Sequence, residues 1–173
     1  MAILLKQFNG STVSAQDDAI LYDLQINENG IIRGCELTFL GANQVRLSEG
    51  RGILKGRIFV IEEETLLVAM SNAGSKKGRI FLHMDLLNTG EPIKIQSIVE
   101  STLPVLVENE KCNYESGVYE LELATYSANE IAINNLVSTF KIIKNEATEA
   151  DIAAILDGTW SETKNYEDPI KTI

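Results

Sequence analysis

The feature that most constrains the fold is a series of short apolar and β-branched segments, separated by polar turns, between Ile31 and about Phe140. Such runs, bounded by glycine and asparagine, are typical of β-strands. We expect strands at Ile31–Leu40, Gln44–Leu47, Gly52–Ile61, Glu64–Met70, Arg79–Leu87, Pro92–Glu100, Tyr119–Tyr126 and Leu136–Ile143. Short strands in this number favour a mainly β fold, an antiparallel β-sandwich or barrel.

Alternation within the segments predicts which faces are buried, because successive side chains of a strand point to opposite sides. The stretch Gly52–Val60 is read as one half-buried strand. Its apolar residues on one face are Leu54, Ile58 and Val60, and its basic residues on the other are Lys55 and Arg57.

A short helix is predicted at residues 14–25. Ser14 and Asp17 have the spacing of a capping box, and Asp17 also favours the positive end of the helix dipole. Ile20, Leu21 and Leu24 recur at helical spacing and are expected to form its buried face. Ala2–Phe8 is expected to be a strand that precedes it.

The chain is expected to form a β-rich domain over residues 1–143 and an acidic helix-plus-tail appendage over residues 144–173. Thr148, the apolar spacing of Ile152 and Ile155, and Gly158 predict a short helix in the second part. The segment from Asn145 onward has seven acidic residues and two lysines.

Charge argues against nucleic acid and membrane surfaces as partners. The formal net charge is −10, and residues 1–60 are balanced, with six basic and six acidic groups. Nucleic acids and anionic lipids attract clustered Lys and Arg, which this chain does not offer. The acidic end is interpreted either as a docking site for a basic partner or as a means of solubility.

Cys35 and Cys112 are far apart in sequence, without metal-binding or redox spacing, and are expected to be reduced thiols. Residues 1–7 lack a basic region and a long apolar run, so a signal peptide is not predicted. We therefore expect synthesis and folding in the cytoplasm.

Nucleotide binding is not predicted. Gly50, Gly52 and Gly56 have a spacing one residue longer than the dinucleotide fingerprint, and they lead into a strand, where phosphate binding needs a helix N-terminus. They are interpreted as turn and bulge residues.

No catalytic, cofactor or metal site is predicted, and the chain is not expected to be an enzyme. His83 shares a strand face with Asp85, which could begin a catalytic triad, but no serine or cysteine lies in a nucleophile-elbow context. The densest carboxylates, Glu62–Glu64 and the Glu120/Glu122 pair, are expected on a solvated sheet face. Neither pattern matches a glycosidase pair or a calcium loop.

Sugar binding is a second possibility for a β-rich chain. Sugar-binding sheets present aromatic platforms, whereas Tyr119 and Tyr126 are expected on opposite faces of their strand.

Two early phrases of the sequence are distinctive: 17–36, containing Asp17-Asp18-Ala19-Ile20-Leu21-Tyr22-Asp23, and Leu40–Phe59. With Ala124-Thr125-Tyr126 and Glu130–Val137, they resemble small structural proteins encoded in the tail modules of phages and prophages of Gram-positive bacteria. The resemblance covers residues 1–143 in patches and is best at 17–60.

This resemblance implies a non-enzymatic structural or adaptor subunit of a phage or phage-like tail, a baseplate or fibre-attachment component. It implies other tail subunits as partners, a homo-oligomeric or multi-copy assembly, and incorporation into a virion or tail particle. Neither a cofactor nor a small-molecule substrate is expected. The alternative is a carbohydrate-binding module that recognises the bacterial cell surface.

Overall fold

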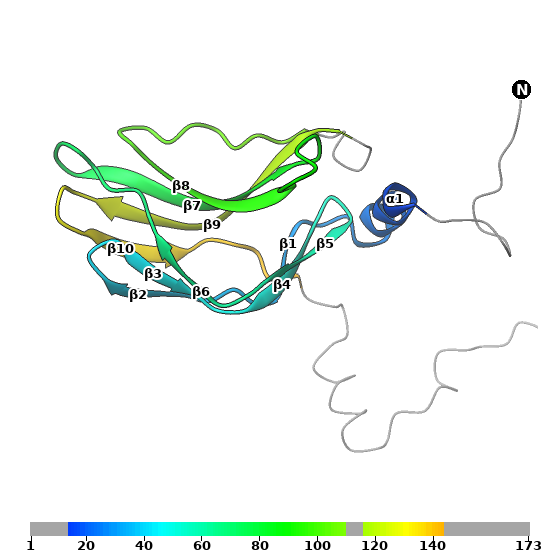
Figure 1. Cartoon of the computed structure of the whole chain (residues 1–173), viewed down its shortest axis with the longest axis horizontal. Coiled ribbons are helices and arrows are strands. Elements are labelled where there is room, and N and C mark those ends of the chain that lie inside the picture. Colours follow the sequence, from blue (N-terminus) through cyan, green and yellow to red (C-terminus); the bar gives the residue numbers. More distant parts are fainter. Residues whose placement is uncertain (1–13, 110–115, 144–173) are drawn as a thin grey trace, which may run out of the picture. The chain divides into compact units, whose positions relative to one another are not determined.

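The computed structural model describes residues 14–109 and 116–143, and within them the chain is mainly β (Figure 1). Ten strands form three antiparallel sheets, and one helix, α1 (Ala15–Ile26), precedes them. The predicted fold class is therefore confirmed. The strand predicted at Ala2–Phe8, the second cysteine at position 112, and the appendage at 144–173 lie outside the described residues.

Two of the sheets are halves of one bent, three-stranded layer. Their strand orders are β1-β4-β5 and β2-β3-β6. The chain passes from one sheet to the other between β1 and β2, between β3 and β4 and between β5 and β6, and it forms hairpins at β2–β3 and β4–β5. The bounds are β1 Gly30–Gly34, β2 Leu37–Gly41, β3 Gln44–Leu47, β4 Gly50–Leu54, β5 Arg57–Ile61 and β6 Glu64–Leu67.

Backbone geometry at Gly34 and Cys35 makes the bend. Both residues have a positive φ, 67° and 61°, which residues other than glycine rarely adopt. Hydrogen bonds nevertheless continue across the bend: the Cys35 N–H donates to the Glu49 carbonyl (3.2 Å), and the Ser48 N–H donates to the Glu36 carbonyl (2.9 Å). The predicted strand Ile31–Leu40 is thus two strands joined by a corner.

The single strand predicted within Gly52–Val60 is wrong, because the chain turns back at Lys55 and Gly56. These residues have φ of 47° and 71°, the positive values that a two-residue hairpin turn requires. The turn resets the alternation. Leu54 remains buried, but Ile58 and Val60 are exposed, and the core residues of the returning strand are Phe59 and Ile61.

The second layer is a four-stranded sheet of order β10-β9-β7-β8. Its strands are β7 (Lys76–Asp85), β8 (Ile93–Glu100), β9 (Val118–Ala128) and β10 (Ile133–Ser138). Tyr119 and Leu123 of β9 are buried, as their alternation with the glutamates predicts. Figure 1 shows this sheet lying over the bent layer.

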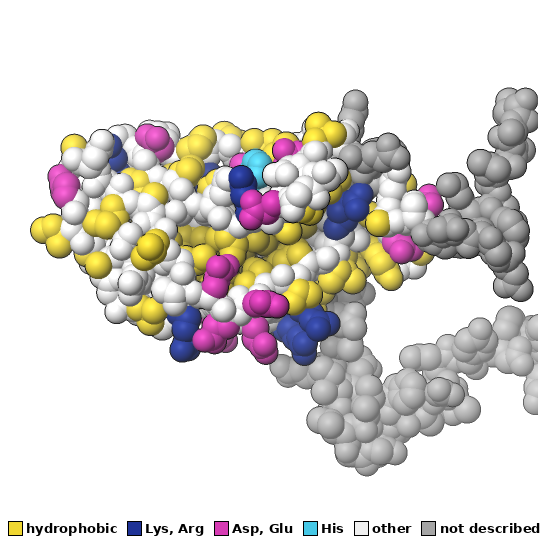
Figure 2. Space-filling model, in the orientation of Figure 1, with side chains coloured by type: hydrophobic (Ala, Val, Ile, Leu, Met, Phe, Trp, Pro, Cys, Tyr) yellow, Lys and Arg dark blue, Asp and Glu magenta, His cyan; other side chains and the backbone are white. Residues whose placement is uncertain are grey.

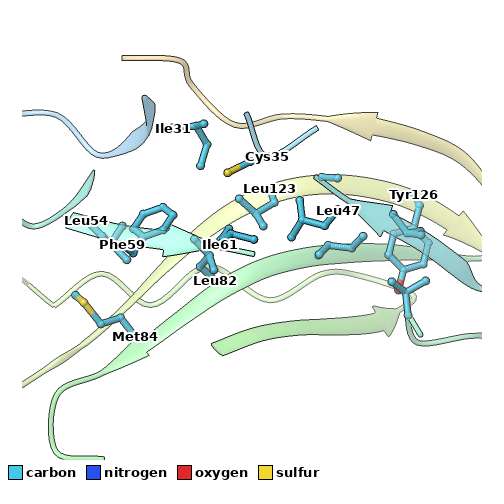
Figure 3. Packing of buried hydrophobic residues seen from close by; sticks show 14 of the residues in the cluster. Ile31, Cys35, Leu47, Leu54, Phe59, Ile61, Leu82, Met84, Leu123 and Tyr126 are labelled. Carbon is cyan, nitrogen blue, oxygen red and sulfur yellow. The ribbon is translucent and has the colours of Figure 1, made fainter. Parts of the chain in front are cut away.

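One apolar core fills the space between the layers, so the described residues form a sandwich (Figure 3). The bent layer contributes Ile31, Leu47, Leu54 and Phe59 among others, and the four-stranded sheet contributes Leu82, Leu123 and Tyr126 among others. Burying apolar side chains from both layers is the main source of stability in such a fold.

Residues 133–143 close one side of the sandwich. The Ile133 N–H donates to the Ala42 carbonyl (2.8 Å), which ties β10 to the first hairpin turn. Further on, Ile31 donates to the Lys141 carbonyl (2.9 Å) and Ile143 donates to the Ile31 carbonyl (2.8 Å). The outer edge of β1 is therefore covered.

Helix α1 begins as predicted but buries a different residue. The Ser14 side chain accepts from the Asp17 N–H, and the Asp17 carboxylate accepts from the Ser14 N–H, a complete capping box. The predicted buried face is wrong for two of its three residues: Ile20 is half-buried, but Leu21 and Leu24 are 39% and 77% exposed, and the fully buried residue is Ala19. The small Ala19 lets the helix backbone approach the β4–β5 turn. No helix in the described ranges is long and apolar enough to span a membrane.

Candidate functional site

Two ion pairs lie on the outer face of the four-stranded sheet. His83 Nδ1 and Glu120 Oε1 are 2.9 Å apart, and Arg79 Nε donates to Glu122 Oε2 at 2.5 Å. All four side chains come from paired strands β7 and β9, where His83 is the cross-strand neighbour of Glu120. The two glutamates are on the sheet face that the sequence predicts, but they are half-buried and paired rather than simply solvated.

These pairs hold the segment 101–109 against the sheet. The second oxygen of Glu120 accepts from the Val107 N–H (2.9 Å), and Arg79 Nη1 donates to the Pro104 carbonyl (2.7 Å). Both carboxylate oxygens of Glu120 are therefore engaged, one with His83 and the other with the Val107 N–H. The hypothetical His83–Asp85 pair does not form: Asp85 Oδ1 accepts from the Leu87 N–H at 3.0 Å. This geometry gives His83 a role in packing the outer face.

Gly50, Gly52 and Gly56, whose spacing is close to the dinucleotide fingerprint, are each required by close packing. A side chain at Gly50 would meet Cys35 Sγ, one at Gly52 would meet the Phe59 ring, and one at Gly56 would meet the backbone of Ala19 in α1. These contacts support their interpretation as structural residues.

The prediction that Tyr119 and Tyr126 lie on opposite faces of their strand is wrong: both are buried in the one core, because the register between β7 and β9 shifts between Ile80 and Phe81. Neither ring forms an exposed platform. Tyr126 donates its hydroxyl to the Ala69 carbonyl (2.9 Å), and Asn29 Nδ2 donates to the Tyr119 hydroxyl (3.2 Å). Burial raises the pKa of Tyr126 to about 12. Both rings serve the core rather than a sugar-binding face.

Cys35 lies at the corner of the bent layer, buried and free of a disulfide. Burial raises the pKa of its thiol to about 11, which keeps it protonated and unreactive near neutral pH. Among the described residues, no group of three or more His, Cys, Asp or Glu side chains is placed to hold a metal ion.

A groove lies between the two layers, on the side opposite to residues 133–143. Its volume is about 460 Å³. The floor is apolar, with Phe59, Ile61 and Leu66 from the bent layer and Leu82, Ile93 and Ile95 from the other sheet. Figure 2 shows hydrophobic side chains in this hollow, with acidic side chains along its rim.

Both strand edges beside the groove are open. Within the part of the chain that the structure describes, no strand pairs with the outer edge of β8 or with the outer edges of β5 and β6. Unpaired N–H and C=O groups of an edge strand are a template for another chain. The groove therefore offers apolar area and backbone hydrogen-bonding groups together.

Glu62, Glu63 and Glu64 form the rim of the groove on one side, and Glu91 and Lys94 lie on the other. The three consecutive glutamates and Glu91 are exposed, as predicted for solvated carboxylates. The groove itself was missed from sequence, because it joins residues 59–66 to residues 91–95 and no local pattern marks which strand edges stay unpaired.

Sequence comparisons add no identity: the chain matches no known protein-family model and no curated protein.

Proposed function

We propose that the chain is a non-enzymatic structural or adaptor subunit of a phage or phage-like tail, a baseplate or fibre-attachment component. The observation that carries the proposal is the groove, which has an apolar floor and, among the described residues, unpaired strand edges on both layers. A subunit that joins neighbours needs such a surface, since strand addition and apolar burial are common modes of protein recognition. The tail is proposed from the resemblance of residues 17–60 to phage tail-module proteins.

The rest of the described surface supports an assembly role. Helix α1 exposes Leu21, Tyr22, Leu24 and Ile26, although it is only twelve residues long. The outer face of the bent layer exposes Ile58 and Val60. Exposed apolar groups gathered in patches mark interaction surfaces more often than scattered ones do. The proposed partners are other tail subunits, including further copies of this chain, after synthesis in the bacterial cytoplasm.

Immunogold electron microscopy of purified particles from the source organism tests the proposal. With antibody to this chain, we expect gold clustered at the tail end of the particles. Particles without label, with the protein free in the lysate, would contradict it. A glycan array on the same purified protein distinguishes the carbohydrate-binding alternative, because an adaptor is expected to bind no sugar.

A further inference from the structure

The outer face of sheet β1-β4-β5 carries two arginines in an unfavourable arrangement. Arg33 and Arg51 are direct cross-strand neighbours, and both are exposed. Like charges directly opposite one another in an antiparallel pair are destabilising. Glu49 lines the same hollow of about 260 Å³, yet among the described residues no ion pair joins it to either arginine. The arginine pair therefore lacks a carboxylate partner within these parts of the chain.

An apolar centre and an acidic end adjoin the arginines. Val60 is the cross-strand neighbour of Arg51, so Arg33, Arg51 and Val60 form one row across three strands. Along β5 and just beyond it, Ile58, Val60 and Glu62 recur at every second residue, and all three are exposed. Val60 also lines the groove whose rim is Glu62–Glu64, so the basic and acidic ends are parts of one surface. We call this set (Arg33, Arg51, Ile58, Val60, Glu62 and Glu63) the charged corner.

We propose that the charged corner is a self-complementary interface on which a second copy of this chain docks through a two-fold axis. In a two-fold interface each residue pair occurs twice, so one surface must contain both complementary halves. Here the arginine end of one copy meets the glutamate end of the other, and the two Val60 side chains meet near the axis. Partner carboxylates then relieve the opposed arginines.

The geometry of the two ends fits such an axis. Starting from Val60, the arginines lie roughly 5 and 10 Å away across the strands, and Glu62 lies roughly 7 Å away along the strand. The two directions are about perpendicular, because cross-strand neighbours lie at right angles to the strand direction. A two-fold axis in the plane of the sheet, bisecting this angle, superposes one end on the other. The sheets would then cross at about 90°, one of the two favoured arrangements for packed sheets.

The proposal rests on the proposed function only for the expectation of several copies, and its test needs no particle. Sedimentation velocity of the purified full chain should show a dimer. Raising the salt from 0.05 to 0.5 M should weaken it at least tenfold, since screening acts on exposed charge pairs. Arg33→Glu/Arg51→Glu and Glu62→Lys/Glu63→Lys should each be monomeric, because each variant opposes like charges twice.

Mixing the two variants gives the decisive result. The glutamates introduced at 33 and 51 face the introduced lysines, and the native arginines face the native glutamates, so an equimolar mixture should restore a dimer. Arg46→Glu/Lys77→Glu and Glu36→Lys/Glu100→Lys change the net charge equally at exposed positions elsewhere, and they should remain dimeric. Circular dichroism confirms that each variant is folded.

Three outcomes would overturn the inference: a monomeric wild-type chain at 100 µM, dimeric corner variants, or a mixture that stays monomeric. None of them bears on immunogold labelling of the tail, so failure of the interface and failure of the proposed function are distinguishable.

Discussion

Gly56 in the β4–β5 turn lies directly against the backbone of Ala19 in α1, so closely that any side chain at position 56 would collide with the Ala19 carbonyl oxygen. Gly56 also has a φ of +71°. Two independent requirements for glycine thus coincide at the contact by which the helix packs on the sandwich.

We predict that Gly56→Ala destabilises the protein by about 2–4 kcal/mol. The positive φ accounts for about 1 kcal/mol and displacement of the helix for the rest. Chemical denaturation measures the loss. Gly74→Ala is the matched control, because Gly74 has a φ of +64° but nothing within 4 Å of the added carbon. Equal losses at both positions would show that the helix contact contributes nothing.

Glu120→Ala should loosen segment 101–109 without unfolding the sheet. The change removes the acceptor of both His83 and the Val107 N–H. Leaving such donors without a partner costs about 1–3 kcal/mol. We expect hydrogen exchange of the Val107 amide to become at least tenfold faster, while amides in the β7–β9 ladder keep their protection. Glu130→Ala, which removes the acceptor of the Gly74 N–H, should leave exchange at Val107 unchanged; unaltered exchange in Glu120→Ala would contradict the role assigned to that residue.

We predict that ionisation of the Cys35 thiol lowers the stability of the protein at alkaline pH. Its pKa is raised from 9.0 to about 11 in the folded protein, so the folded state holds the proton more tightly than the unfolded state. The resulting stability is complete below pH 9 and is lost as the pH rises from 9 to about 11. At pH 10 the loss should be about 1 kcal/mol.

Denaturation curves at pH 8, 9 and 10 measure this effect. In Cys35→Ser the decline between pH 9 and 10 should fall to less than half, and a decline that steepens above pH 10 should remain, because the pKa of Tyr126 is raised from 10.0 to about 12. An unchanged decline between pH 9 and 10 in Cys35→Ser would assign it to another group. In a Cys112→Ser background, native Cys35 should react with a thiol reagent only on unfolding.

Truncation after Ile143 should leave a folded subunit with an unchanged melting temperature that fails to enter particles. The hydrogen bonds from residues 141–143 to Ile31 remain in this variant. Truncation after Phe140 removes them, together with the Lys141–Glu28 ion pair, and should lower the melting temperature by roughly 5 °C. Normal incorporation of the Ile143 truncation would exclude residues 144–173 from the assembly contacts.

Local sequence patterns predicted where the helix and strands lie better than they predicted which of their faces are buried. The capping box at Ser14 and the alternation around Glu120 were recovered, because each depends on residues close in sequence. The hairpin at Lys55–Gly56 was missed because Lys is not a usual residue at positive φ, and one unrecognised turn moved Ile58 and Val60 to the wrong face. Leu24 was assigned to a buried face by spacing alone, whereas tertiary packing selected Ala19.

The two surfaces proposed for assembly, the groove and the charged corner, could not be predicted from local sequence patterns. The groove depends on which strand edges remain unpaired, and this is decided by the return of residues 133–143 to the opposite side. The opposition of Arg33 and Arg51 depends on register, which a bulge between Ile31 and Arg33 shifts by one residue. The sequence shows which residues are available for these surfaces, but the pairing of the strands decides which of them lie next to one another.

The return of residues 133–143 to β1 also sets the order in which a nascent chain can finish folding. The hairpins of residues 30–67 pair only with near neighbours in sequence and can form early, whereas the outer edge of β1 waits for a segment about 110 residues later. Until synthesis reaches Ile143, both sides of the sandwich are open and liable to pair with another chain. Within residues 14–109 and 116–143, completion of the β1 edge leaves the groove side with the unpaired edges of β8, β5 and β6, so we expect a neighbour that adds a strand to join there.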